Sequence, residues 1–371
     1  MQTESASSPL VVDAVGVRIG IDVDHLGDDD RHAVRTAWRD ALSPERGSPA
    51  HTIVPDADVE AGVMLSRLSS DVTRSAIAAR QGEQWMLHAA GLAAPDGGVI
   101  VLVGRSGAGK TTAVSVLARR WGYVSDEAIG IDDDGRVHAY RKPLSVITDG
   151  HVSKVQHAPD DLGLQPLPDG PLHLRRIVLL DRDHKHARAR LLTVPLSVAF
   201  ADLAPNSSAL AAMPHPLRTM LRVVARTGGV LLAQYAEAAD LEPLLDRLDS
   251  VLLSAENAAP AHAGGRVDHE GGEAVARPNP TSIYRRATVV DWCPVDDEQI
   301  AVLSAEADGR GVLRVLAGLA PAIWSAAADD IAVADLVRET TARFDEAPPA
   351  DAVETAMVQL VEAGLLTVVL S

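Results

Sequence analysis

One nine-residue stretch of this 371-residue chain combines glycines, a lysine and hydroxyl side chains in a spacing that could bind phosphate. It consists of Gly104, Arg105, Ser106, Gly107, Ala108, Gly109, Lys110, Thr111 and Thr112, and it fits the pattern G-x-x-x-x-G-K-[ST]. Glycines let the backbone curl around an anion and point consecutive N–H groups at it. The lysine of this pattern reaches the β- and γ-phosphates of a nucleotide, and the next hydroxyl binds Mg²⁺. We therefore expect residues 104–112 to bind ATP or GTP with Mg²⁺.

A second group of reactive side chains, Ser125, Asp126 and Glu127, follows about one helix length after Lys110. A carboxylate beside a nucleotide can accept the proton of an acceptor hydroxyl during phosphoryl transfer, or it can only hold Mg²⁺ or a water. The residues alone leave both alternatives open. Asp181, which ends the apolar run Leu179-Leu180, is an alternative partner for Mg²⁺.

The elements that must position these groups are predicted from apolar runs and turn residues. A buried strand over 98–103 leads into the glycine loop, and a helix over 112–120 follows it. We also predict strands over 85–93, 122–125, 176–180 and 228–232, and a closing helix over 241–253. The carboxyl ends of strands in an open α/β sheet meet at one edge, so Asp126 and Glu127 should face the phosphates.

Three stretches together resemble the catalytic core of the HPr kinase/phosphorylase family: Leu87 to Gly91, the glycine loop, and Gly122 to Glu127. The resemblance covers about residues 85–250 and implies an α/β fold with a P-loop kinase core of the HPr kinase type. It implies a serine kinase in which Asp126 deprotonates the acceptor hydroxyl and Lys110 holds phosphate. Thr111, Glu127 and Asp126 would place Mg²⁺.

His88 matches the active-site histidine of that family, although a histidine inside an apolar strand is more often a core residue. The chain lacks the Glu-Leu-Arg-Gly-x-Gly signature of true HPr kinases and has residues 139–145 in its place. The resemblance therefore does not extend to HPr as substrate. Arg141 and Lys142 in this segment are candidate phosphate contacts, or ordinary solvated side chains.

The rest of the chain divides by composition. Residues 1–84 alternate strand-like and helix-like stretches, with a strand over 15–21 and a helix over 29–42, and form an N-terminal α+β region without recognisable chemistry. The kinase-like domain spans 85–255, and 256–282 reads as a flexible linker because it has few large apolar residues. Residues 283–371 should form a small winged-helix-like domain of three strands and three helices.

Residues 283–371 resemble the PqqD-like peptide-recognition domain found in pathways for ribosomally made, modified peptides. The resemblance implies that an extended leader peptide adds a strand to an open sheet edge. The implied contact residues are Val312, Leu313, Arg314 and Val315, with Val353, Met357 and Leu360 opposite. The alternative is that apolar members of this set fill the core of the domain. Winged-helix units also bind DNA, but the acidic last helix disfavours that use.

Composition limits the partners. A net charge of −17 argues against general binding to nucleic acid or to anionic membranes. No apolar run reaches the roughly 20 residues of a membrane helix, and no signal peptide is recognisable, so a cytoplasmic protein is expected. Cys293, the one cysteine, should be a small core residue. The histidines of 183–186 lie in a polar stretch that reads as a solvated turn rather than a metal site.

Together these features predict ATP-dependent phosphorylation of a serine, less often a threonine, on a ribosomally made precursor peptide. The C-terminal domain would capture the leader and raise the effective concentration of the acceptor. The alternatives are a kinase of a small molecule or carrier protein, and a nucleotide-gated protein that delivers the peptide to another enzyme. Whether the chain forms a homo-oligomer stays open.

Overall fold

The computed structural model describes residues 9–45, 47–146, 155–248, 279, 281–306 and 309–369. The fold is mixed α/β with several sheets. It divides into two compact units, one of Met1–Pro195 and Asn206–Ala259 and one of Leu196–Pro205 and Pro260–Ser371, which we describe separately. Most of the predicted linker 256–282 lies outside the described residues, as does the end of the predicted helix 241–253. No helix in the described part of the chain is long and apolar enough to cross a membrane.

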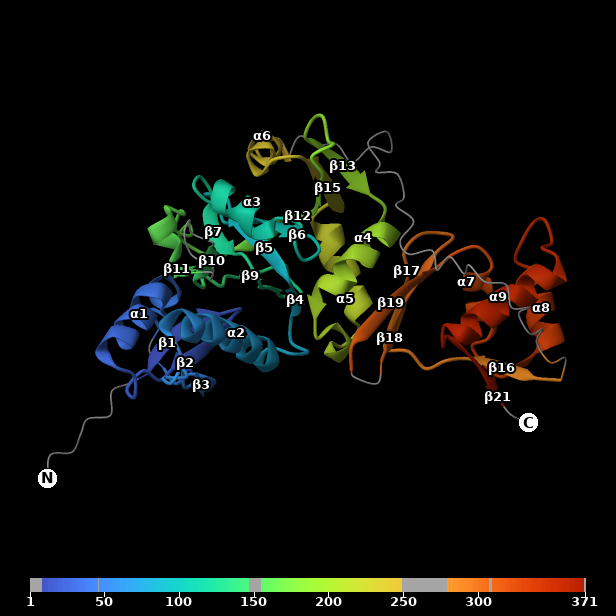
Figure 1. The fold of residues 1–371 in the computed structure, drawn as a ribbon. Coiled ribbons are helices and arrows are strands. Elements are labelled where there is room, and N and C mark those ends of the chain that lie inside the picture. The colour runs from blue at the N-terminus through green and yellow to red at the C-terminus, as the bar shows by residue number, and fades with distance from the viewer. Residues whose placement is uncertain are drawn as a thin grey trace, which may run out of the picture. The chain divides into compact units, whose positions relative to one another are not determined.

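A six-stranded sheet is the centre of the first unit. Its strands, in spatial order, are β13 (Arg190–Val194), β15 (Val230–Tyr235), β12 (His173–Arg182), β6 (Gly98–Val103), β5 (Ala89–Ala93) and β7 (Gly122–Ser125) (Figure 1). β6, β12 and β15 are parallel, while β5 runs antiparallel to both β6 and β7. β7 therefore runs in the same direction as β6. Consequently β6, β7, β12 and β15 all end at one edge, where β5 begins.

Helix α3 (Lys110–Leu117) packs on this sheet through its buried Ala113, Val114 and Leu117. The same core contains side chains from the neighbouring strands and the segment that follows β15: Leu102, Val178, Leu231, Leu241 and Leu244. Every residue of β6 is buried, as expected for a central strand with both faces covered. The predicted strand 98–103 is confirmed, and the predicted helix begins at Lys110 rather than Thr112.

The predicted single strand over 85–93 is wrong, because the chain changes sheets at His88. β4 (Trp85–Leu87) pairs in a four-stranded sheet, whereas β5 belongs to the central sheet. The other strands of the four-stranded sheet are β14 (Ser207–Ser208), β8 (Ile129–Ile131) and β9 (Val137–His138). The mostly apolar run 85–93, interrupted only by His88 and Gly91, did not indicate this change of partner strand.

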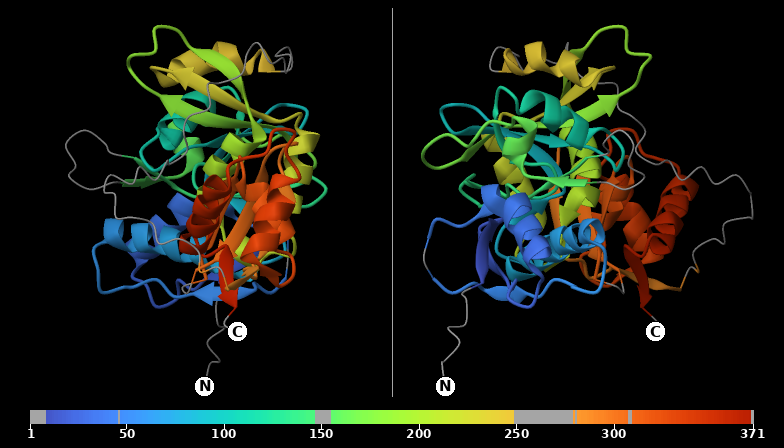
Figure 2. Two further views of the ribbon diagram at one scale, coloured as in Figure 1. Left: turned by 90° about the vertical axis from the view of Figure 1, so that its right-hand side faces the viewer. Right: turned by 60° about the vertical axis from the view of Figure 1, so that its left-hand side comes forward.

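The N-terminal residues form a three-stranded sheet of β1 (Leu10–Ala14), β2 (Val17–Ile21) and β3 (His51–Ile53). The predicted strand 15–21 is shorter, because Val15 and Gly16 form a hairpin turn with φ of 52° and 82°. Helix α2 (Ala61–Ala79) packs on this sheet beside α1 (Asp28–Trp38) (Figure 2).

The N-terminal sheet and helices share one apolar core with Met86, Ala128 and Tyr140 of the following region. The structure thus joins residues 9–84 to the region of the glycine loop within one compact unit. The remaining short elements are η1 (Arg39–Ala41), β10 (Leu144–Val146), β11 (Val155–His157), η2 (Pro159–Leu162), η3 (Ala204–Asn206), η4 (Leu210–Ala212), α5 (Pro216–Arg226), η5 (Ala238–Leu241) and α6 (Glu242–Leu245).

The second unit contains two three-stranded sheets. One has β17 (Asp291–Pro294), β18 (Ile300–Ala305) and β19 (Gly311–Leu316), and the other has β20 (Ile331–Ala332), β16 (Ile283–Arg286) and β21 (Leu366–Val369). The sequence did not predict the second sheet. The three predicted helices of this domain are α7 (Ala320–Ala326), α8 (Val333–Thr341) and α9 (Ala350–Glu362). Helix α4 (Leu196–Leu203) belongs to this unit and contacts β19.

Candidate active site

The glycine loop connects β6 to α3 at the sheet edge where the parallel strands end. Gly107 and Gly109 have φ of 82° and 87°, a left-handed conformation that favours glycine. A Cβ at Gly104 would lie 2.9 Å from the Cβ of Ala108, so this position also needs glycine. Arg105, Ser106 and Gly107 are exposed. The loop therefore has the backbone geometry and the accessibility that phosphate binding requires.

Lys110 folds back over this loop. Its Nζ donates to the carbonyl of Gly104 at 2.7 Å and to that of Arg105 at 3.5 Å. Burial lowers the pKa of Lys110, while the charge of Asp126 acts in the opposite direction. Lys110 is 7% exposed, and its bonds to these two carbonyls hold its Nζ beside the exposed part of the loop.

Asp126, directly after β7, is buried and contacts both the loop helix and its own strand. Thr111 Oγ1 donates to Asp126 Oδ2 at 3.2 Å, and the Tyr123 hydroxyl donates to Asp126 Oδ1 at 3.1 Å. Burial and then the negative charge of Asp126 raise the pKa of Tyr123 well above its usual value, so the phenol remains a donor. The strand-end prediction for Asp126 is thus consistent with its position beside Thr111.

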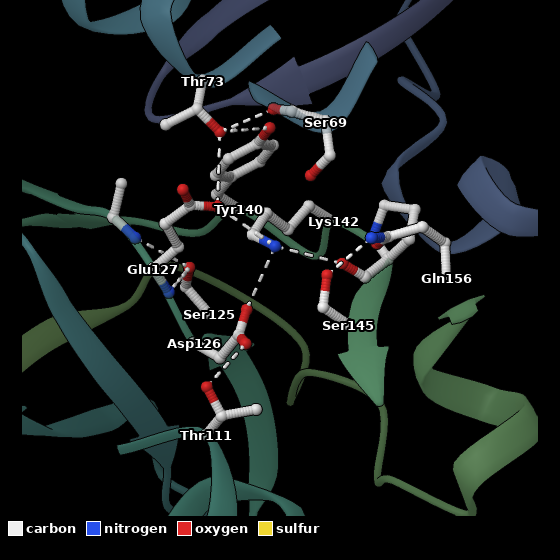
Figure 3. Close-up of polar contacts among 12 residues, drawn as sticks. Ser69, Thr73, Thr111, Ser125, Asp126, Glu127, Tyr140, Lys142, Ser145 and Gln156 are labelled. Atoms are coloured by element: carbon white, nitrogen blue, oxygen red, sulfur yellow. Dashed lines mark hydrogen bonds and ion pairs between the residues drawn. The ribbon is translucent and has the colours of Figure 1, made fainter. Parts of the chain in front are cut away.

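Lys142 lies between the two acids of this site (Figure 3). Its Nζ is 3.0 Å from Glu127 Oε2 and 3.4 Å from Asp126 Oδ1. Burial lowers the pKa of Lys142, but the charges of Asp126 and Glu127 outweigh burial and raise it overall. Lys142 is therefore an ammonium group inside the acid pair and not a solvated side chain. Its neighbour Arg141 donates to the carbonyls of Tyr123 and Gln165, which makes it a structural contact.

His88 lies between β4 and β5, at the same edge of the sheet. Its main-chain N–H donates to the carbonyl of Asn206 at 2.7 Å, and its side chain is exposed. Partial desolvation and the positive charge of Lys110 lower the pKa of His88, against the opposing influence of Glu127. The structure thus brings His88 into the electrostatic neighbourhood of Lys110, Asp126 and Glu127.

Asp181, the alternative partner for Mg²⁺, is engaged elsewhere. Its Oδ2 accepts from Gln234 at 2.8 Å and lies 3.3 Å from His186 Nε2. Ser125 likewise has a local role, because its Oγ accepts the main-chain N–H groups of Glu127 and Ala128 at 3.2 Å each. These contacts favour Asp126 over Asp181 as the carboxylate that faces the loop.

The oxygen pair of Thr111 and Asp126 fits Mg²⁺. This ion prefers oxygen ligands, and in nucleotide sites it is held by one or two protein oxygens together with phosphates. Thr111 Oγ1 and Asp126 Oδ2, 3.2 Å apart next to the loop, offer such oxygens. Among the described residues, no group of three or more His, Cys, Asp or Glu side chains is placed to hold a metal ion.

The predicted peptide-contact residues fall into two classes. Val353, Met357 and Leu360 on α9 are 0%, 0% and 4% exposed and belong to the apolar core with Trp324. Their side chains fill that core, so the expectation that they face a peptide is corrected for these three positions. Val312, Leu313, Arg314 and Val315 lie on β19, are half-buried, and pair with β18 on one side only within the described sheet.

Sequence reasoning missed the groups behind the acid pair. Thr73 on α2 has its Oγ1 3.5 Å from Glu127 Oε2 and 3.1 Å from the Tyr140 hydroxyl (Figure 3). Thr73 and Glu127 are 54 residues apart in the chain, so no local spacing could indicate this contact. Lys142 was noticed only as a possible phosphate ligand, because its sequence gives no sign that it is buried.

The chain matches no known protein-family model. Nor does any curated protein match it in sequence. Among solved structures it is similar to the Hpr(Ser) kinase/phosphatase from Coxiella burnetii, with 12% sequence identity and a TM-score of 0.25, over 44% of this chain and 93% of that chain. The PqqD-like character of residues 283–371 stays a prediction.

Proposed function

We propose that this chain is an ATP-dependent kinase that phosphorylates a serine, less often a threonine, of a ribosomally made precursor peptide. The observation that carries the proposal is the position of Asp126 Oδ2, 3.2 Å from Thr111 Oγ1 at the start of the loop helix. A carboxylate that lies beside a nucleotide loop can accept the proton of an acceptor hydroxyl as phosphate is transferred.

In the proposed reaction, the serine Oγ forms a bond to the γ-phosphorus as the bond from that phosphorus to the β,γ-bridging oxygen breaks. Asp126 takes the hydroxyl proton, and ADP leaves. When the nucleotide binds, Lys110 Nζ would leave the carbonyls of Gly104 and Arg105 and donate to phosphate oxygens. The main-chain N–H groups of the loop would donate to the other phosphate oxygens. Thr111 and Asp126 would hold Mg²⁺, which would supply positive charge to neutralise the phosphates during transfer. His88, near Lys110, would be a polar neighbour of the transferred group.

Peptide capture is the second part of the proposal. An extended leader would add a strand to the edge of β19 that pairs with no other strand among the described residues, at Val312, Leu313, Arg314 and Val315. Such capture supplies binding energy through main-chain hydrogen bonds. The catalytic site then needs to recognise little of the peptide sequence itself. It also raises the effective concentration of the acceptor serine near Asp126.

The test is intact-mass spectrometry of a short serine-containing precursor peptide, encoded beside this chain, after incubation with the protein, Mg²⁺ and ATP. We expect a gain of one phosphoryl group that disappears with the Asp126→Asn variant, and fragmentation should place it on a serine. GTP in a parallel reaction would identify the preferred nucleotide. Leader binding without any mass gain would contradict the kinase and favour a nucleotide-gated delivery protein.

A further inference from the structure

The proposed reaction leaves one charged group of the site without a role, namely Lys142. This lysine is 3% exposed. Its Nζ donates to the carbonyl of Pro143 at 3.1 Å and lies 3.0 Å from Glu127 Oε2 and 3.4 Å from Asp126 Oδ1. An ammonium group has three N–H donors, and here it has three acceptors. Lys142 is therefore held in one place by groups on both acids and on its own backbone.

The contacts of Asp126 are divided between its two oxygens. Oδ1 faces the Tyr123 hydroxyl at 3.1 Å and the Lys142 ammonium at 3.4 Å. Oδ2 faces Thr111 at 3.2 Å. Tyr123 is fully buried, so turning the Asp126 side chain away from it would leave the buried hydroxyl without this acceptor, which is costly. The arrangement keeps Oδ2 directed toward the nucleotide loop.

The contacts of Glu127 are with Lys142 and α2 and not with the glycine loop. Its Oε2 lies against Lys142, and the nearest hydroxyl is Thr73 on α2 at 3.5 Å. If Lys142 paired with Asp126 alone, the neighbouring carboxylate of Glu127 would have no cation beside it. That arrangement would be unfavourable, because a buried charge needs a partner. Glu127 supplies the partner that lets Lys142 bind Asp126 without removing the negative charge of the cluster.

We infer that Lys142 and Glu127 form an ion pair that positions Asp126, and that Glu127 is the counter-ion of Lys142 and not a ligand of Mg²⁺. This inference rests on the proposed function and assigns roles within the same site. It replaces the sequence expectation that Glu127 places the metal. Lys142 is a positioning residue, since it acts on the reaction through the orientation of Asp126.

The first experiment measures metal binding without catalysis. The full-length chain is titrated with Mn²⁺ in the presence of a non-hydrolysable ATP analogue, and free Mn²⁺ is followed by electron paramagnetic resonance. We expect Asp126→Asn to weaken Mn²⁺ binding by about 10- to 100-fold and Glu127→Gln by less than about threefold. A loss in Glu127→Gln as large as in Asp126→Asn would overturn the inference.

The second experiment separates positioning from folding. Lys142→Met should lower kcat by about 100-fold with little change in the KM for ATP, and Lys142→Arg should retain more of the rate because it keeps the charge. Lys142→Met can fail to fold, since it leaves two neighbouring carboxylates without a cation. The double variant Lys142→Met with Glu127→Gln removes one charge of each sign and should fold, yet keep the low kcat. A wild-type kcat in this double variant would contradict a positioning role.

The two experiments distinguish this inference from the proposed function. The Mn²⁺ titration requires only that the loop binds a nucleotide, so its result stands even if the acceptor is not a peptide. Failure of the wild-type chain to bind Mn²⁺ and nucleotide at all would remove the proposed function and this inference together. Intact binding with equal losses in both acid variants would remove only the inference.

Discussion

The two compact units differ in how they bury charged side chains. The first unit clusters them next to the glycine loop, where Lys110, Asp126 and Lys142 are 7%, 7% and 3% exposed, whereas the second unit buries Asp291 outside its main apolar core. The core of the second unit, around Trp324 and Met357, is formed by apolar side chains and Tyr284. Burial of charge is unfavourable unless the charges are paired, and such clusters gather where chemistry is done. The buried apolar side chains of α9, in contrast, are spaced to pack in the core of the second unit.

This contrast separates the predicted site residues by kind. Residues assigned to phosphate and proton transfer lie together in the first unit. Three of the seven residues assigned to peptide contact are core residues in the second, which leaves β19 as the surface to test. The predictions below probe this division in order of expected effect.

Replacement of Asp126 by Asn should produce the largest change. The amide cannot take the hydroxyl proton, so kcat should fall by about 10²- to 10⁴-fold while ATP binding remains. Transfer is measured by intact mass and ATP binding by calorimetry. Asp169→Asn is the matched control, because Asp169 is exposed, and it should leave kcat unchanged. Equal losses in both variants would mean that the effect is unspecific.

Replacement of Lys110 by Ala should remove phosphate binding. Loss of one positioned cation at a phosphate site is expected to lower transfer by about 10²- to 10³-fold and to weaken ATP binding as well. Arg119→Ala, an exposed basic residue after the same helix, serves as the control. Undiminished affinity for ATP in Lys110→Ala would contradict the assignment of residues 104–112 as the nucleotide loop.

Truncation of Met357 to Ala should affect the second unit only. Its side chain is fully buried, so the cavity left behind should lower the free energy of unfolding of this unit by about 2–5 kcal/mol. Thermal unfolding measures the loss, and Gln359→Ala on the exposed side of α9 is the control. If Met357→Ala instead weakened leader binding without any change in unfolding, the core assignment of Met357 would be wrong.

The smallest expected effect is the titration of His88. Its pKa lies below the usual 6.5, so the folded chain takes up this proton at lower pH than the unfolded chain. The contribution of His88 to the stability of the folded state is therefore fully present above pH 6.5. It is lost as the pH falls from 6.5 through the lower pKa of the folded state. The contribution is small because the ring is exposed. Histidine Cε1–H resonances measured against pH should show a midpoint below 6.5, and Lys110→Ala should move it upward. A midpoint above 6.5 would place His88 outside the influence of Lys110.

Local patterns predicted elements of the first unit well where the pattern is contained in a short segment. The apolar run 98–103, the glycine loop and the strand 122–125 each specify their own conformation, and the structure has them at those positions. The edge at which Asp126 meets the loop follows from strand direction. These features needed no knowledge of distant residues.

Features that depend on distant partners could not be predicted. The break at His88 arises because two sheets share one apolar run. Lys142 is paired with Asp126 and Glu127, which lie 16 and 15 residues before it in the chain. In the second unit, β16 and β21 pair across more than 80 residues of chain, and a short run such as Ile283–Arg286 carries too little pattern to predict that pairing.

The shared core around Tyr140 has a consequence for the modularity of this protein. Residues 9–84 contribute α2, and α2 brings Thr73 against both Tyr140 and Glu127. A version of the chain that began at residue 85 would expose that core to water and remove the Thr73 contacts to Tyr140 and Glu127. The catalytic half therefore has no clean recombination point at residue 85, and exchange between related proteins would have to transfer α2 together with the acid pair.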